Sequence, residues 1–133
     1  MSEPTGLRIT AIHNAKKGAK DENEEWILIR NDGEQVWKIE DWELTDQTAT
    51  QQRVHIYRFP TTTSAGKWQF DPGESIYVFT GMGRDAFLPK TNGDRPQFHF
   101  YMNRRAMVWN NTGDRAYLRN QDGTFVTQPF PVP

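Results

Sequence analysis

Residues 23–46, "NEEWILIRNDGEQVWKIEDWELTD", hold eight carboxylates and three tryptophans in 24 residues. The run "EWILIRN" is rich in β-branched and aromatic residues and ends at the turn sequence "NDG", which is typical of a strand. In "DWELTD", Trp42 and Leu44 alternate with Asp41 and Glu43, as in a strand with one buried face. We therefore interpret this stretch as two strands joined by a turn, with the carboxylates at their solvent-facing positions.

A catalytic interpretation of the same carboxylates is the alternative. On a strand, Asp41 and Glu43 lie on one face roughly 7 Å apart, a separation that suits glycoside hydrolysis. Polar alternation explains both residues without chemistry, however. The histidines, His13, His55 and His99, form neither an HxH nor an HExxH motif, and no nucleophile motif is present. The chain is therefore predicted not to be an enzyme.

Short runs of the same kind continue along the chain without a helical pattern, and turn sequences separate them. In 7–13, Leu7, Ile9 and Ala11 are expected on one face. Eight or nine strands, each with one apolar face, predict an all-β antiparallel β-sandwich. The other runs lie at 53–59, 74–81, 97–102, 106–110, 115–120 and 124–128, with a further short strand within "QVWKI".

Length and composition limit the function classes. The 133 residues suit one domain, predicted at 7–128, between a flexible N-terminus at 1–6 and an extended Pro-rich tail at 129–133. Without cysteine there is no disulfide, thiolate nucleophile or cysteine metal site. No apolar run is long enough for a membrane helix, so membrane insertion is not expected. The start lacks a secretory pattern, which favours a cytoplasmic location.

The acidic segment "KDENEE" (20–25) is a candidate calcium site. Asp21, Asn23 and Glu25 match the first three ligand positions of an EF-hand loop, but Trp26 occupies the position that needs glycine. The EF-hand match therefore fails, and a solvated loop is the preferred interpretation. A weaker calcium site of another geometry stays open, and no cofactor is predicted.

Three binding surfaces are candidates. Both faces of "EWILI" and of "SIYVF" are apolar, so one face of each strand needs a partner or a covering loop, which points to a protein partner or self-association. Trp37 or Trp68 would provide a stacking platform for a carbohydrate. A basic region at 84–119 with interleaved aromatics would suit nucleic acid, although a net charge of −1 gives no general attraction to it. Its basic residues are Arg84, Lys90, Arg95, Arg104, Arg105, Arg115 and Arg119, and its aromatics are Phe98, Phe100, Tyr101 and Trp109.

The segments "NEEWILIRNDGEQVWKIEDWELTD", "DPGESIYVF" and "VWNNTGDRAYLRNQDGTFV", in this order, resemble the lamin tail domain family over about residues 7–128. That resemblance implies an immunoglobulin-like β-sandwich that acts as an interaction or accessory module, in nuclear lamins for proteins and DNA. The chain lacks heptads, so it is similar to the tail without the filament rod, as in bacterial members.

The resemblance also implies which residues face the core. Leu28 stands where the family commonly has an acidic residue, so it is expected outward and apolar. Trp26, Leu28 and Trp68 are the predicted partner contacts, and residues 82–105, which have no clear family counterpart, are a candidate for specialised function. The implied core residues are Ile27, Ile29, Trp42, Leu44, Ile76, Val78, Ala116 and Leu118.

Overall fold

The structure of the protein is a computed structural model. It describes residues 6–13, 25–40, 42–47, 56–60, 69–89, 96–104, 115–120 and 123–129, and for 47, 115, 120 and 123–129 it describes the backbone alone. Throughout these residues the fold is all-β, as predicted. Among them there is no helix long and apolar enough to cross a membrane.

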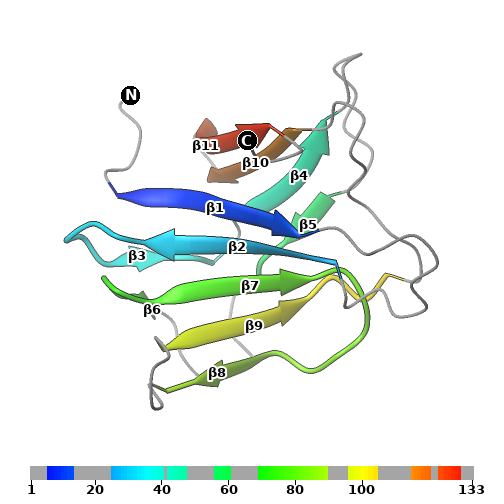
Figure 1. The fold of residues 1–133 in the computed structure, drawn as a ribbon, viewed down its shortest axis with the longest axis horizontal. Helices are drawn as coiled ribbons and strands as arrows, with labels where there is room; N and C mark the ends of the chain where they lie inside the picture. Colours follow the sequence, from blue (N-terminus) through cyan, green and yellow to red (C-terminus); the bar gives the residue numbers. More distant parts are fainter. Residues whose placement is uncertain are drawn as a thin grey trace.

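The larger sheet has five strands in the order β1, β2, β7, β9, β8 (Figure 1). Three of its four pairings are antiparallel, but β7 and β9 are parallel, so the prediction of a purely antiparallel sandwich is wrong at this point. The reason is topological: β9 enters between β7 and β8, and β7 therefore pairs with the strand after next. The bounds are β1 Leu7–His13, β2 Trp26–Asn31, β7 Ser75–Phe79, β8 Ala86–Leu88 and β9 Gln97–Tyr101.

A four-stranded sheet in the order β11, β10, β4, β5 is antiparallel throughout and crosses the larger sheet at an angle (Figure 1). A short two-stranded ribbon of β3 and β6 lies beside the turn that ends β2. The bounds are β3 Trp37–Lys38, β4 Glu43–Gln47, β5 Ile56–Arg58, β6 Gln69–Phe70, β10 Arg115–Asn120 and β11 Gly123–Pro129. The two-residue β3 agrees with the short strand predicted in "QVWKI".

Side chains from both sheets form one hydrophobic core. The Phe59 ring, next to β5, meets the Phe100 ring of β9 edge-on with centroids 5.3 Å apart, which joins the two sheets. Alternation along each strand supplies the core, because every second side chain points inward. All eight core residues implied by the resemblance are buried there: Ile27, Ile29, Trp42, Leu44, Ile76, Val78, Ala116 and Leu118.

A β-bulge changes the face of β1. The pairing of β1 with β2 shifts between Ile9 and Ala11, so that Ile9 lies opposite Ile29 and Ala11 lies opposite Leu28. After the extra residue, Ile12 points into the core and Ala11 points outward. The prediction that Leu7, Ile9 and Ala11 share one face is therefore wrong for Ala11.

The "NDG" turn does not join two strands of one sheet. It leads from β2 in the larger sheet to β3, and the chain then crosses to β4 in the smaller sheet. Two carboxylates of this stretch are not solvent-facing either: Glu25 is 1% exposed and Asp46 is 2% exposed. Asp46 shares the inward face of β4 with Leu44, because it lies two residues further along the strand.

Two further strands lie between the runs that the sequence predicts as strands. Residues 60–73 contain β6 and residues 81–96 contain β8, and both strands are too short to show an alternation in sequence. The strand predicted at 106–110 lies outside the described residues. Pro129, predicted to begin the tail, is the last residue of β11, an outer strand of its sheet where a proline is tolerated.

Candidate interaction face

The outward side of the larger sheet carries six rings instead of polar side chains. Because Ile27, Ile76 and Phe98 and their inward neighbours fill the core, the residues between them point away from it. The His13 side chain is exposed, and the other five rings are half-buried. We call this surface the aromatic face, and its rings are His13, Trp26, Tyr77, Phe79, His99 and Tyr101.

The rings of the aromatic face form a continuous network across four strands. His13 stacks on Trp26 at 4.8 Å between centroids, and Trp26 meets Tyr77 edge-on at 5.4 Å. Tyr77 meets His99 at 5.6 Å. Phe79 stacks on Tyr101 at 5.1 Å and contacts His99 at 5.2 Å. Such pairs are worth about 0.5–1.5 kcal/mol each beyond area burial, so they hold the rings in place.

Leu28 lies in the middle of this face, but it is not an exposed contact. Its backbone stands opposite Ala11 on one side and Tyr77 on the other, and its side chain is only 7% exposed. The expectation that Leu28 presents an open apolar surface is therefore wrong. Trp26, the second predicted contact, belongs to the network, and Trp68 lies outside the described residues.

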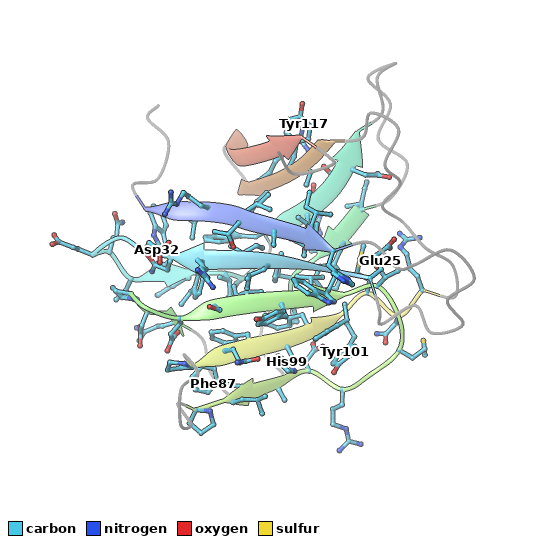
Figure 2. All side chains as sticks on the ribbon, in the orientation of Figure 1. Glu25, Asp32, Phe87, His99, Tyr101 and Tyr117 are labelled. Atoms are coloured by element: carbon cyan, nitrogen blue, oxygen red, sulfur yellow. The ribbon has the colours of Figure 1, made fainter. Side chains whose placement is uncertain are left out.

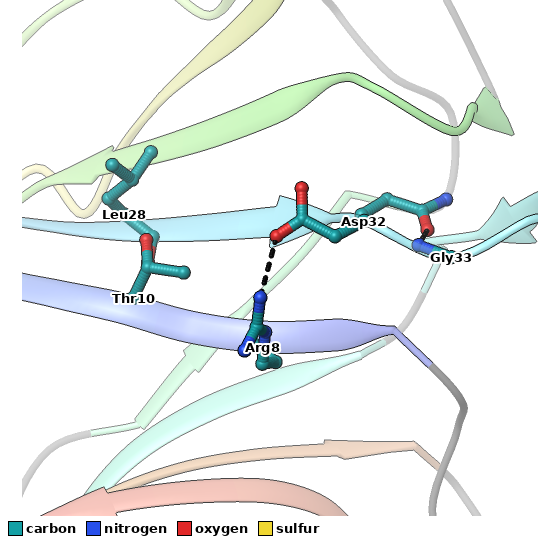
Figure 3. Close-up of polar contacts among 6 residues, drawn as sticks. Arg8, Thr10, Leu28, Asp32 and Gly33 are labelled. Carbon is teal, nitrogen blue, oxygen red and sulfur yellow. Dashed lines mark hydrogen bonds and ion pairs between the residues drawn. The ribbon is translucent and has the colours of Figure 1, made fainter.

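The charged side chains that the described strands place on this face are two arginines, and both lie at one end of it. Arg8 and Arg30 lie opposite each other where β1 begins and β2 ends. Arg8 pairs with Asp32, just beyond β2, at 3.1 Å, while Thr10 and Leu28 lie farther along the same two strands (Figure 3). Among the described residues of the five strands, no outward position carries Asp, Glu or Lys.

His99 lies next to Tyr77 in the middle of the face. It projects from β9 close to Tyr101 (Figure 2). Its Nε2 lies 2.6 Å from Gln97 Oε1, and the Tyr77 and Phe79 rings flank it. Burial lowers the pKa of His99 below its ordinary value of 6.5, because the imidazolium would lose hydration. The centre of the face is therefore uncharged at neutral pH.

The loop that follows β7 supports the ring-rich end of the sheet. The Thr80 hydroxyl donates a 2.7 Å hydrogen bond to the buried Glu25 carboxylate, at the opposite end of β2 from Asp32 (Figure 2). Gly83 packs so closely on the Tyr101 ring that any side chain at 83 would collide with it. The Tyr101 amide donates to the Asp85 carboxylate at 3.2 Å.

The outward side of the smaller sheet has a different chemistry. Arg58 pairs with Glu43 at 2.9 Å in a surface ion pair. Arg119 donates to the Thr45 hydroxyl at 2.6 Å and lies 4.4 Å above the centre of the Tyr117 ring. Charged and polar groups thus contact one another on this side, where Ile56 of β5 is an exposed apolar side chain.

The predicted basic region is only partly assembled. Arg84 is exposed in the loop after β7, and the Arg104 amide donates to Thr80 O, so both lie at the same end of the larger sheet. Arg119 lies on the other sheet. Phe98 and Phe100, predicted to interleave with these cations, are fully buried in the core, so that prediction is wrong. Lys90 and Arg105 lie outside the described residues.

The metal and carbohydrate candidates of the sequence can be placed in part. They contain no group of three or more His, Asp or Glu side chains that could hold a metal ion. Asp41 and the segment 20–24 are outside them, and Glu25 is bonded to Thr80. Trp37, a candidate sugar platform, packs against the core and meets Trp42 edge-on at 6.2 Å. A shallow hollow at the β2–β3 turn is lined by Asp32, Gly33, Glu34 and Gln35.

The residues that suggested the family resemblance hold the end of β2. Asn31 is fully buried, and its side-chain amide donates to the carbonyls of Gln35 and Phe70, while its Oδ1 accepts from the Gly33 amide. In the "DPGE" turn, Glu74 accepts from the Asp71 amide at 2.8 Å. Gly73 supplies the positive φ of that turn.

The sequence model of the lamin tail domain matches residues 1–129. The chain belongs to the lamin tail domain family. The fold is accordingly immunoglobulin-like, and the family is generally non-enzymatic. A comparison with curated proteins finds no match.

Half of the rings in the aromatic face of this lamin tail domain were not predicted. The sequence showed that "SIYVF" and "EWILI" are apolar on both sides, which holds for Trp26, Tyr77 and Phe79. His99 and Tyr101 join the network through the parallel pairing of β9 with β7, and His13 joins it through the bulge in β1. The signal available was the two-residue spacing of rings in "SIYVF" and "QFHFY", which places them on one face.

Proposed function

We propose that this lamin tail domain is a non-enzymatic interaction module that binds a protein partner through its aromatic face. The observation that supports it is composition: outward positions that are normally polar carry Trp, Tyr, Phe, His and Arg, while Asp, Glu and Lys are missing from them in the described strands. The cores of protein interfaces have this composition, because aromatic and arginine side chains bury large areas at low entropic cost.

The packing of the rings also favours recognition. The series of ring contacts that runs from His13 to Tyr101 holds each ring in place before a partner arrives. Binding therefore costs little side-chain conformational entropy. Five of the rings are half-buried, and each keeps surface that a partner can cover. Binding through such a face depends on shape and apolar contact, and it should therefore depend little on salt.

Site-specific photo-crosslinking tests the proposal. A photoreactive phenylalanine replaces Tyr101 on the aromatic face or, as the control, Arg58 on the outward side of the smaller sheet. Crosslinked protein is expected from position 101 and not from position 58. Adding Tyr77→Lys to the position-101 protein should reduce that product about tenfold, because a cation replaces an apolar contact at the centre of the face.

Two results would overturn the proposal. The first is an absence of crosslinked protein at position 101, and the second is an equal yield from positions 101 and 58. Crosslinking of position 101 to polynucleotide in place of protein would move the assignment to nucleic acid. Thermal unfolding of each variant establishes that the domain stays folded.

A further inference from the structure

The aromatic face is divided into three rows by the strand registers. Residues that pair across β1, β2, β7, β9 and β8 define each row. The outer two rows lie four residues, about 13 Å, apart on β2, β7 and β9, and five residues apart on β1 because of its bulge. One outer row holds both arginines and the other holds four rings. The cationic row is Arg8, Arg30, Ser75, Gln97 and Leu88; the middle row is Ala11, Leu28, Tyr77, His99 and Ala86; the ring row is His13, Trp26, Phe79 and Tyr101.

This order makes the face complementary to itself in one orientation. When two copies face each other about a twofold axis that lies between them and runs across the strands, strand order is kept and strand direction reverses. The cationic row of each copy then lies over the ring row of the other. A twofold axis along β7 would instead reverse the strand order, so that Arg30 of one copy lies over Gln97 of the other and Arg8 lies over Leu88. In that orientation no arginine meets a ring.

We propose that the occupant of the aromatic face is a second copy of this chain, related by the axis that runs across the strands. The inference rests on the proposed function, because it names the partner of the same face. In this arrangement Arg30 of each copy lies over the Trp26 and Phe79 rings of the other, and the middle rows pack against each other. Arginine over an aromatic ring is attractive, and the chain already uses it where Arg119 covers Tyr117 at 4.4 Å.

The size of the face sets the strength of the dimer. Five strands about 4.8 Å apart and about five residues long cover roughly 300 Å² in projection. A stable interface buries about 800 Å² on each partner, so this one belongs to the weak class. We expect a dissociation constant of roughly 0.01–1 mM. Association is therefore visible only in concentrated protein or where copies are held close together.

Complementary substitutions test the orientation. Arg30→Glu removes the cation that should lie over a ring, and Trp26→Lys removes the ring and places a cation opposite Arg30. Each variant alone should dimerise at least about tenfold more weakly than the parent in sedimentation equilibrium. In a mixture of the two, Glu at 30 faces Lys at 26 and the native Arg30–Trp26 contact is kept, so dimerisation should return to within about threefold of the parent.

A second pair and a control keep the test decisive. Gln97→Glu with Tyr101→Lys repeats the design on β9 if Trp26→Lys does not fold, since Gln97 and Tyr101 occupy the same two rows. Arg58→Glu makes the same charge change on the smaller sheet and should leave dimerisation unchanged. If dimerisation does not recover in either mixture, the proposed orientation is wrong. If Arg58→Glu weakens dimerisation as much as Arg30→Glu does, the aromatic face is not the interface.

A parent chain that stays monomeric at about 1 mM would refute the dimer altogether. That outcome is distinct from failure of the proposed function, because crosslinking from position 101 to a different protein would still support an interaction face. A crosslink between two copies of the chain would support both. The absence of either product would remove both.

Discussion

Replacing Asn31 by alanine should destabilise the fold more than any loss of surface charge. The Asn31 side chain is fully buried and makes three hydrogen bonds. Its Nδ2 donates to Gln35 O at 2.8 Å and to Phe70 O at 3.0 Å, and its Oδ1 accepts from the Gly33 amide at 3.2 Å. One residue thereby connects the end of β2, the turn to β3 and the strand β6.

The magnitude follows from these bonds. Each contributes about 1 kcal/mol net, and the buried bond to Phe70 O costs more when broken because that carbonyl loses its side-chain donor away from water. Asn31→Ala should therefore lower the free energy of unfolding by about 3 kcal/mol. With a urea dependence of about 1.5 kcal/mol/M, the unfolding midpoint should fall by about 2 M.

Urea unfolding followed by tryptophan fluorescence measures this shift. Asn31→Asp should cost at least as much as Asn31→Ala, because a carboxylate oxygen would replace the donor that faces two carbonyl oxygens. Glu34→Ala, at an exposed position of the same turn, is the matched control and should stay within about 0.5 kcal/mol of the parent. A loss below about 1 kcal/mol for Asn31→Ala would refute the reasoning.

Three further predictions concern titration and burial. Burial lowers the pKa of His99, so as pH decreases the imidazole binds a proton in the unfolded chain before it does so in the folded one. The free energy of unfolding should therefore fall as pH decreases below about 6.5. Urea titrations at high and low pH measure this fall, and His99→Gln should make it smaller. Burial, and secondly the charge of Asp85, raise the pKa of Tyr57 well above its ordinary value. Asp85→Asn should therefore lower the pKa of Tyr57, which an alkaline titration measures from tyrosinate absorbance. An unchanged titration curve would contradict the contribution of Asp85. Thr80→Val removes the hydroxyl that bonds the buried Glu25 carboxylate and should cost about 2–3 kcal/mol in urea, whereas Thr80→Ser should cost less than half of that; equal losses would show that the hydroxyl is not responsible.

The sequence predicted the core because alternation is a local property. Ile27 and Ile29, or Ala116 and Leu118, are two residues apart on one strand, and an extended chain places such pairs on one face wherever the strand lies in the sheet. The same reasoning failed at Ala11, because a bulge inserts one residue that no local pattern marks. It also failed for Asp46, because this carboxylate occupies an inward-facing position of its strand, where an apolar residue is expected.

The arrangement of strands could not be predicted from the same signals. The parallel pairing of β7 with β9 depends on residues about twenty positions apart, and the described residues between them, 80–89 and 96, contain no crossover helix that could indicate it. That pairing brings His99 beside Tyr77 and Tyr101 beside Phe79. The sequence therefore indicated the candidate face through two strands that are apolar on both sides. Its extent and the position of its charged end depend on how the strands pair.

The insertion of β9 between β7 and β8 has a consequence for synthesis on the ribosome. When β7 has been translated, it can pair with β2, but its other edge has no strand partner until β9 follows. At about 5–20 residues per second that delay lasts roughly 1–4 s. During this interval a nascent chain exposes an apolar strand edge, the kind of template on which neighbouring chains aggregate. Slow translation of residues 80–96 should therefore lower the soluble yield, and a chaperone that binds extended apolar segments should restore it.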